Sequence, residues 1–163
     1  MKLSYHIPIW KLILLAGLAG GLSEILWIAS YSGAGSVNGA IVAQQVTVSV
    51  WPSGTESAFS PALGVIIHLA LSIALAAIAV PLLSRIAARY SGATIMFGSA
   101  MLMLAIVWKV NFFIILPLIN PAFVVLMPLG VTLASKLLFG LAMGFVMYNA
   151  TQEKALSATA NRE

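Results

Sequence analysis

Four ionisable side chains stand alone within the long apolar stretches of this sequence. They are Glu24, His68, Lys109 and Lys136, and each stretch contains one of them. An Asp, Lys or Arg at the centre of a membrane-spanning helix costs about 2.5 to 3.5 kcal/mol of insertion free energy. One such group in every stretch therefore indicates a buried polar layer. Side chains of these types could bind an ion or a polar substrate, carry a proton, or pair with one another.

Small and polar residues accompany each of these four groups at helical spacing. Intervals of three, four or seven residues place each set on one face of a helix. The four sets are Gly17, Gly21, Glu24 and Ile28; Gly64, His68, Ser72 and Ala76; Gly98, Ala105 and Lys109; and Thr132, Lys136, Gly140 and Gly144. Small residues let helix backbones approach closely, most clearly in the GxxxG pairs Gly17/Gly21 and Gly140/Gly144. We therefore expect the ionisable groups to share the packing face of a helix bundle.

The predicted polar layer consists of Glu24, His68, Lys109, Lys136 and Thr132. In one interpretation Glu24 pairs with Lys109 or Lys136, His68 stays neutral, and the layer fixes the helix register. In the other, the layer marks a path for an ion, a proton or a substrate. Because the layer has one acid and two lysines, one lysine has no carboxylate with which to pair. That lysine must be neutral, extend its amine to the membrane surface, or meet an anion or a partner subunit's acid.

The composition of the chain is that of an integral membrane protein. Of its 163 residues, 61% are hydrophobic and 7% are charged, and the mean hydropathy is +1.06. A soluble domain has about 25% charged residues. The net charge of +4 comes largely from basic residues at the ends of the apolar stretches, so it indicates membrane topology rather than nucleic-acid binding.

We predict an all-α bundle of four transmembrane helices, in a single domain that covers residues 1–163. The predicted spans are residues 11–31, 61–83, 93–116 and 121–149, and each can cross about 30 Å of hydrocarbon. Lys and Arg are absent from residues 32–60 and 117–120. The positive-inside rule therefore predicts that both termini are cytoplasmic, in a bacterial inner (plasma) membrane. A cleaved signal peptide is the alternative interpretation of the first span.

The connections between spans carry further signals. Residues 32–60 form the one longer external loop, and residues 152–163 form a cytoplasmic tail. Residues 37–45 are consistent with a helix, whereas residues 46–51 alternate like a strand. Because four apolar spans leave no sheet for a strand to join, we predict a short helix on the outer membrane surface.

Prolines and one asparagine mark the ends and interruptions of the predicted helices. Pro128 is expected to kink the last span beside the polar layer, because it removes a helical hydrogen bond. Pro117 is expected to close the third span. Asn120 suits the N-cap of the next helix and Pro121 its first turn.

The sequence offers little for catalysis, for metal binding or for a cofactor. It contains no Cys and no Asp, so thiolate ligands, thiol chemistry and a Ser–His–Asp set are excluded. Methionines in the third and fourth spans are interpreted as apolar filler rather than as metal ligands: Met96, Met101, Met103, Met127, Met143 and Met147. We predict no catalytic residues, no metal and no cofactor, and we do not expect an enzyme.

Four spans with one glutamate, Glu24, in the first of them resemble the small multidrug resistance transporters. The resemblance implies a Glu24 that exchanges protons for cationic drugs. The chain departs from that family in its long external loop and in its two intramembrane lysines, which would repel a cation.

Two functional hypotheses follow. The first is a non-catalytic accessory or assembly subunit of a membrane complex, which suits the small size, the short aqueous loops and the two GxxxG faces. The second is a small oligomeric transporter or channel, coupled to ions or protons, that uses the polar layer. The expected partners are the lipid bilayer and either further copies of this chain or other membrane subunits, without nucleic acid.

Overall fold

Most of the chain that the structure describes is helical. The computed structural model describes residues 7–35, 37–90 and 92–160, with only the backbone of residues 55, 56 and 153–160, and these ranges contain no β-strand. In chain order the elements are α1 (Ile9–Gly33), α2 (Gly39–Val50), η1 (Pro52–Glu56), α3 (Ser60–Arg89), α4 (Ala93–Val110), η2 (Asn111–Ile115), α5 (Leu116–Ile119), α6 (Pro121–Leu126) and α7 (Leu129–Ala160). η1 is a 3₁₀ helix and η2 is a π-helix.

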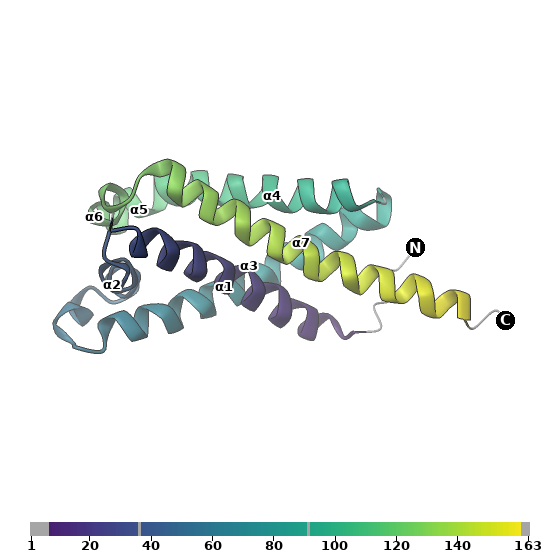
Figure 1. The fold of residues 1–163 in the computed structure, drawn as a ribbon, viewed down its shortest axis with the longest axis horizontal. Coiled ribbons are helices and arrows are strands. Elements are labelled where there is room, and N and C mark those ends of the chain that lie inside the picture. Colours follow the sequence, from purple (N-terminus) through teal and green to yellow (C-terminus); the bar gives the residue numbers. More distant parts are fainter. Residues whose placement is uncertain (1–6, 36, 91, 161–163) are drawn as a thin grey trace.

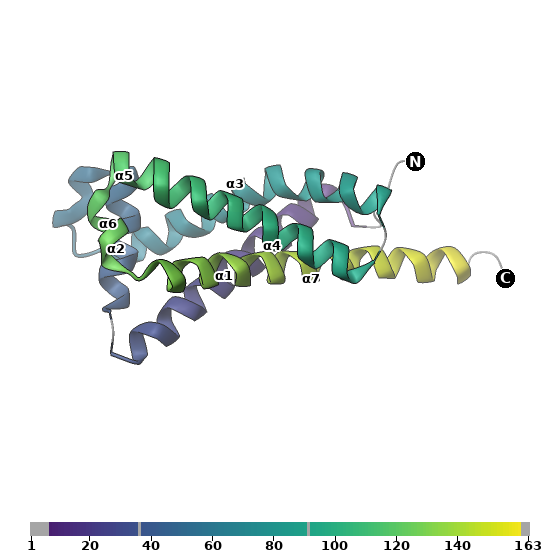
Figure 2. The same ribbon diagram turned by 90° about the horizontal axis from the view of Figure 1, so that it is seen from above.

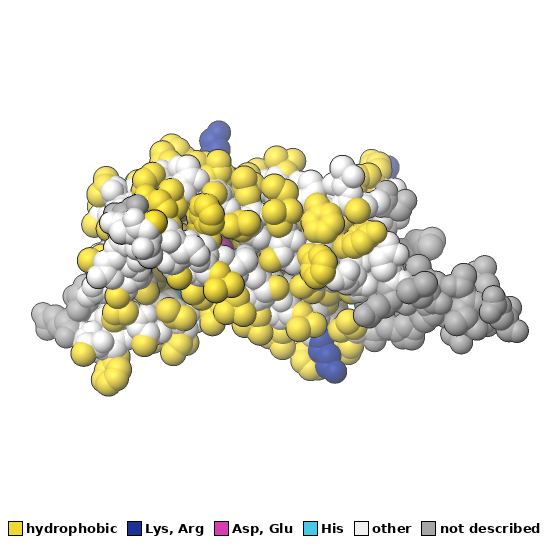
Figure 3. Space-filling model, viewed as in Figure 1, with side chains coloured by type: hydrophobic (Ala, Val, Ile, Leu, Met, Phe, Trp, Pro, Cys, Tyr) yellow, Lys and Arg dark blue, Asp and Glu magenta, His cyan; other side chains and the backbone are white. Residues whose placement is uncertain are grey.

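Four helices are long and apolar enough to cross a membrane. They cover Ile9–Gly33, Ser60–Arg89, Ala93–Ile119 and Leu129–Gln152, and the third consists of α4, η2 and α5 in succession. Hydrophobic side chains dominate the face of the molecule shown in Figure 3, with Lys and Arg at only a few places. The described part of the chain is thus all-α with four helices long and apolar enough to span a membrane, as the sequence predicts.

The four long helices run side by side, and the short helices lie across one end of them. α1 packs against α3 and α7, and α7 packs against α4, which gives the order α4–α7–α1–α3 (Figure 1). α2 and α6 lie at the end opposite the start of α1 and the end of α7 (Figures 1 and 2). At the α2 end, α3 and α4 stand on opposite sides of the bundle, and they converge toward the turn that joins them (Figure 1).

Glycines allow the spans to approach closely. A Cβ on Gly17 would lie 2.7 Å from the Cα of Ile73, and a Cβ on Gly140 would lie 2.9 Å from the Cα of Met101. These contacts join α1 to α3 and α7 to α4. The other two glycines of the GxxxG pairs also face a neighbouring helix, Gly21 against Ser72 and Gly144 against Phe97.

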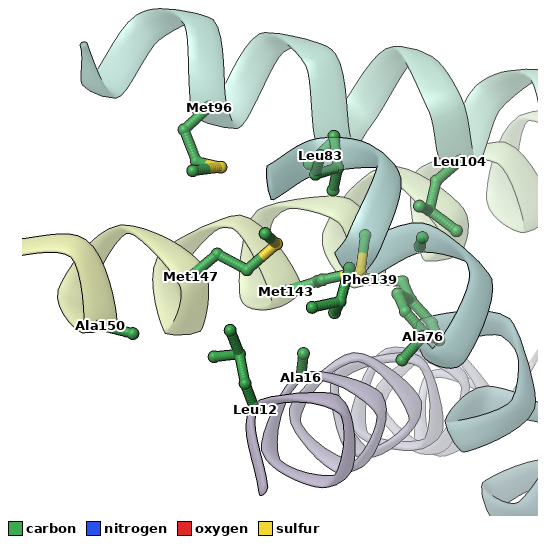
Figure 4. Close-up of a cluster of buried hydrophobic side chains, with 13 residues drawn as sticks. Leu12, Ala16, Ala76, Leu83, Met96, Leu104, Phe139, Met143, Met147 and Ala150 are labelled. Carbon is green, nitrogen blue, oxygen red and sulfur yellow. The ribbon is translucent and has the colours of Figure 1, made fainter. Parts of the chain in front are cut away.

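The apolar core lies in the half of the bundle away from α2. Side chains from all four spans converge there, as Figure 4 shows for Leu12, Ala16, Ala76, Leu83, Met96, Leu104, Phe139, Met143, Met147 and Ala150. Three of the methionines that the sequence suggests as filler thus pack among aliphatic and aromatic side chains. The polar residues discussed below lie on the α2 side of this core.

Pro128 interrupts the last predicted span instead of bending it. α6 ends at Leu126, Met127 is extended with φ −132° and ψ 143°, and α7 begins at Leu129. The ring of a proline disfavours the helical conformation of the residue before it, so the chain breaks at Met127. The predicted helix over residues 121–149 is therefore two helices, and the span is α7 alone.

Pro117 does not close the third span, which is a second correction. The helix continues through it to Ile119, and the π-helical turn Asn111–Ile115 comes directly before α5. A proline ring clashes with the carbonyl four residues earlier in a regular α-helix, here that of Phe113. The wider π-helical turn accommodates the proline without ending the helix.

The longer connection contains one helix where the sequence leaves helix and strand open. α2 covers Gly39–Val50, and Asn38 caps it by accepting a hydrogen bond from the N–H of Ala40. Residues 46–50, which alternate like a strand in sequence, belong to this helix. A short helix between the first two spans is thus present, and its position on the outer membrane surface stays a prediction.

Candidate functional site

Glu24 lies at the centre of a polar cluster that joins three spans. It comes from α1 and is only 3% exposed. Ser135 Oγ of α7 donates a hydrogen bond to Glu24 Oε1 at 2.8 Å, and Lys136 Nζ donates one to Oε2 at 2.8 Å. His68 of α3 approaches the same Oε2, with its Nε2 at 3.5 Å. Of the two lysines that the sequence allows as partners, the structure pairs Glu24 with Lys136.

Close packing of α1 on α7 positions this cluster. A Cβ on Gly20 would collide with the ring of Phe139, so the two helices can touch here only because residue 20 lacks a side chain. Phe139 follows Lys136 by one helical turn, and its ring centroid lies 5.6 Å from Lys136 Nζ. The ammonium group therefore lies between the carboxylate and an aromatic ring, both of which favour a cation.

His68 is the unsatisfied member of the cluster. Its Nε2 is buried and has no hydrogen-bond partner among the described residues, because the approach to Glu24 lacks hydrogen-bond geometry. The His68 side chain is 23% exposed, so the ring is partly open on one side. A buried polar atom without a partner costs about 1–3 kcal/mol, which makes this nitrogen a candidate for binding another molecule.

Two tryptophans bind the first turn of α7. Trp27 Nε1 donates a hydrogen bond to the carbonyl of Val131 at 3.0 Å, and Trp108 Nε1 donates one to Thr132 Oγ1 at 2.9 Å. The Thr132 hydroxyl donates in turn to the carbonyl of Leu129 at 3.0 Å. Thr132, which the sequence places in the polar layer, is thus engaged at the start of α7 and connects it to α4.

A cavity of about 600 Å³ lies beside the cluster, between the spans and next to α2 and α6. The polar end of this cavity is formed by Glu24, His68, Ser135 and Lys136. Ser49, Ser72, Asn111 and Thr132 add further polar groups to the wall. The remaining lining residues are apolar or glycine and come from α1 to α7. The predicted polar layer therefore borders an internal space, with three of its four ionisable residues at one end.

Asn120 holds α2 over this cavity. Its side-chain amide donates hydrogen bonds to the backbone and side-chain oxygens of Gln45, at 3.1 and 2.9 Å, and to Ser49 Oγ at 3.0 Å. Its Oδ1 accepts a hydrogen bond from the N–H of Phe123 at 3.2 Å. Asn120 is thus the predicted N-cap of α6, and it also attaches α2 to the hairpin between the third and fourth spans.

Lys109 does not join the cluster, which corrects the prediction that it shares a layer with Glu24 and His68. Its side chain is exposed, and it makes no ion pair or hydrogen bond within the described part of the chain. Next to it in sequence, Trp108 points inward to Thr132. Because successive helical residues are rotated by about 100°, Lys109 turns away from the bundle.

The rotation of α4 explains this difference. Its buried residues are Met96, Ala100 and Leu104, spaced four apart, and the same spacing leads to Trp108. Gly98, which the sequence analysis places on the packing face with Lys109, is exposed and has open space where a Cβ would be. The packing face of this helix therefore carries Met96, Ala100 and Leu104, and Gly98 lies off it.

Ser135 and Asn111 also line the cavity, although neither was predicted from the sequence as a site residue. A buried carboxylate such as that of Glu24 needs more than one hydrogen-bond donor. Ser135 is the polar residue next to Lys136 in the sequence, so it could have been predicted as the second donor. Asn111 follows Trp108 by three residues and therefore lies near the inward face of the third span. Its position becomes evident only once the rotation of α4 is known.

No family model matches this sequence, and neither the curated proteins nor the solved structures compared with it give a match. The geometry describes a carboxylate whose two oxygens both accept hydrogen bonds. Within the described residues, no group of three or more His, Cys, Asp or Glu is placed to hold a metal ion. The cluster is therefore suited to hydrogen bonding and charge pairing.

Replacing Lys136 with Met is expected to lower the free energy of unfolding by about 3–5 kcal/mol, because it leaves the buried Glu24 carboxylate without a counter-charge. Unfolding in detergent micelles measures the effect. Lys109→Met is the matched control and should change stability by no more than about 0.5 kcal/mol. The double variant Glu24→Gln/Lys136→Met should recover most of the loss. Equal effects of the two lysine variants would show that the ion pair does not stabilise the bundle.

Proposed function

We propose that this chain is a non-catalytic accessory or assembly subunit of a membrane protein complex. The observation that supports this function is the contrast between its two intramembrane lysines. Lys136 is paired with Glu24 inside the bundle, whereas Lys109 is exposed and has no partner among the described residues. A cation that faces hydrocarbon is costly, so a complementary partner at Lys109 would stabilise the chain in the membrane.

The depth of Lys109 supports a protein partner rather than a lipid headgroup. Its span, Ala93–Ile119, has 27 residues and is about 40 Å long, against about 30 Å of hydrocarbon. Lys109 precedes Ile119 by ten residues, so its Cα lies about 10 Å inside the hydrocarbon of a centred span. The Cα–Cβ bond tilts toward the helix N-terminus, which directs this side chain away from the nearer surface. A carboxylate on a neighbouring helix therefore meets Lys109 more easily than a phosphate does.

The acidic residues of the chain favour a different protein over a second copy as the partner. The chain has four of them, and Glu24 is already engaged by Lys136. The other three, Glu56, Glu153 and Glu163, lie outside the four candidate spans. A second copy thus has no free carboxylate at the depth of Lys109. We infer a partner that carries an Asp or Glu within one of its own spans.

We also propose that the chain lies in a bacterial inner membrane with both termini in the cytoplasm and residues 32–60 outside. The distribution of basic residues supports this topology, since residues 32–60 and 117–120 contain none and the turn between α3 and α4 follows Arg85 and Arg89. The arrangement of the helices is compatible with it, because α1 starts and α7 ends at the same end of the bundle (Figure 1).

An oligomeric transporter or channel, coupled to ions or protons, is the second candidate function. One observation favours it, namely that Glu24, His68 and Lys136 line the same cavity. Intramembrane ionisable groups beside a cavity are typical of ion and proton paths. Against it, Glu24 is held by two donors at 2.8 Å and is not free to exchange a cargo cation.

Replacing Lys109 with Met is expected to remove the membrane partner, because the intramembrane charge pair is lost. After purification in mild detergent, the wild-type chain and Lys109→Arg should retain one other membrane protein in stoichiometric amount, and Lys109→Met should lose it. Mass spectrometry and the mass of the intact complex measure this. Lys11→Met, which removes a lysine near the start of α1, is the matched control and should retain the partner.

Charge reversal tests the chemistry of that partner. Lys109→Asp combined with a lysine at the partner's intramembrane acid should restore the complex. If the wild-type chain purifies alone, or if Lys109→Met retains the same protein, the proposed subunit function is wrong.

Cysteine labelling is expected to reveal the proposed topology, and the chain has no native Cys to interfere. A membrane-impermeant maleimide should label Ser53→Cys in intact spheroplasts, because residue 53 would face the outside. Gln152→Cys should react only after the membrane is permeabilised. The opposite pattern would mean that the bundle is inverted.

Reconstitution in liposomes separates the two candidate functions. With a trapped pH-sensitive dye and an imposed pH gradient, we expect the wild-type chain to conduct no more protons than empty liposomes, because Glu24 is already paired. A proton flux that is lost in Glu24→Gln and retained in Lys109→Met would establish the transporter instead.

A further inference from the structure

The cavity beside Glu24 has the size and the lining of a binding site for a small molecule. Its volume of about 600 Å³ lies within the range of about 300–1,000 Å³ that is usual for ligand sites. Most of its wall is apolar, and its polar side chains gather mainly at one end, around Glu24, His68 and Lys136. An apolar space with a few convergent polar groups suits a molecule that is apolar over most of its length and polar at one end.

The cavity opens sideways, between α3 and the η2–α5 part of the third span. Five residues line the cavity and are also exposed on the outer surface: Ala29, Val50, Leu71, Ile115 and Ile119. Three of them, Leu71, Ile115 and Ile119, lie on α3 and on η2–α5. All five are apolar, so the rim of the opening is as hydrophobic as the surface around it. In a membrane this opening faces the acyl chains of the bilayer. A ligand would therefore enter from the lipid rather than from water.

The end of the bundle beside α2 is closed. The carbonyl of Ala43 in α2 lies against the Cα of Gly64 in α3, at a position where no side chain would fit. On the other side, Asn120 fixes α2 to the hairpin through Gln45 and Ser49. α2 is thus attached to both helices that flank the opening, and it covers the end of the cavity while leaving the side open.

The charges around the cavity select an uncharged polar group. Glu24 and Lys136 neutralise each other, and both carboxylate oxygens already accept hydrogen bonds. Lys136 has three N–H donors and uses one of them on Glu24, while His68 Nε2 is without a partner. Because the pair is neutral overall, a charged head group would find no free counter-charge in the cavity, and it would still lose its hydration on leaving water. A hydroxyl or carbonyl group can accept a hydrogen bond from Lys136 without adding a charge. A turn of the partly exposed His68 ring would bring its buried Nε2 to the same group.

We propose that this cavity binds an uncharged, membrane-soluble amphiphile, with a hydroxyl or carbonyl head at His68 and Lys136 and an apolar chain in the side opening. The proposal does not rest on the subunit function above. The opening lies between α3 and η2–α5, and binding there requires neither Lys109 nor a partner protein. The ligand also provides the missing hydrogen-bond partner of His68.

Photolabelling of the full-length chain in nanodiscs tests the ligand and its site. The probe is a long-chain primary alcohol with a diazirine near its hydroxyl group, and mass spectrometry locates the labelled peptides. We expect saturable labelling of the segments around His68 and Lys136, which excess unlabelled 1-octadecanol removes. The corresponding carboxylic acid and quaternary ammonium probes should label these segments at least about tenfold less, equivalent to about 1.4 kcal/mol of binding free energy.

Filling the cavity with a larger side chain tests whether the labelling occurs inside it, and the same substitution outside the cavity is the matched control. Val46 of α2 lines the cavity, whereas Val48 of the same helix does not. Val46→Phe should therefore abolish the saturable labelling, and Val48→Phe should leave it unchanged. If Val46→Phe does not fold, as judged by its elution and melting temperature, Val65→Phe on the facing wall of α3 replaces it.

Three results would overturn the proposal. Labelling spread over the lipid-facing surface without saturation would mean that the cavity holds no specific ligand. Unchanged labelling in a folded Val46→Phe or Val65→Phe would place the site elsewhere. Equal or stronger labelling by the charged probes would show that the assigned head group is wrong. Each of these results leaves the partner experiment on Lys109 unaffected.

Discussion

The hydrogen-bonded ion pair between Glu24 and α7 is the interaction on which the rest of the structure depends. A buried carboxylate must be compensated, and Ser135 and Lys136 each supply one donor at 2.8 Å. Because the two donors are adjacent on α7, sliding or rotating α1 by one residue would remove both bonds together. The pair therefore fixes the register of two spans that apolar packing alone leaves free to shift, since lipid gives little reason to prefer one apolar contact over another.

The dense packing near the ion pair and the cavity beside it both follow from how far apart the helices lie. Gly17 and Gly20 bring α1 against α3 and α7 about two turns and one turn before Glu24, so this part of the bundle is densely packed. Toward α2 the outer helices α3 and α4 diverge (Figure 1). The space between them is covered at its end by α2, which Asn120 holds in place. Asn120, together with the close contact between α2 and α3, thus keeps α2 over the space where the outer helices diverge.

The features that depend on composition and local chemistry could be predicted from the sequence. Those that depend on how a helix is rotated about its axis, such as which residues of α4 face inward, could not. The number of spans and the Asn120 cap follow from hydropathy and from capping rules. Rotation of α4 does not, because nearly all of its residues are apolar and small residues occur on more than one face. The small residues suggested that Gly98 faces inward, whereas Met96, Ala100 and Leu104 form that interface. A proline inside a predicted helix can bend the helix or break it, and the sequence does not distinguish the two outcomes. Here the helix breaks because Met127, the residue before Pro128, is extended.

The rotation of α4 determines both the exposed face that carries Lys109 and the cavity wall to which Asn111 contributes. Trp108 points to Thr132 inside the bundle, and this hydrogen bond requires Lys109 to face outward and Asn111 to face the cavity. These residues lie within a single turn, where the helix passes into the π-helical segment η2. A partner that holds Lys109 would therefore also fix the rotation of Trp108 and the wall that Asn111 contributes to the cavity. The two lysines therefore differ in their surroundings: Lys136 is paired with Glu24 inside the bundle, and Lys109 is exposed on the outside, where the proposed partner would meet it.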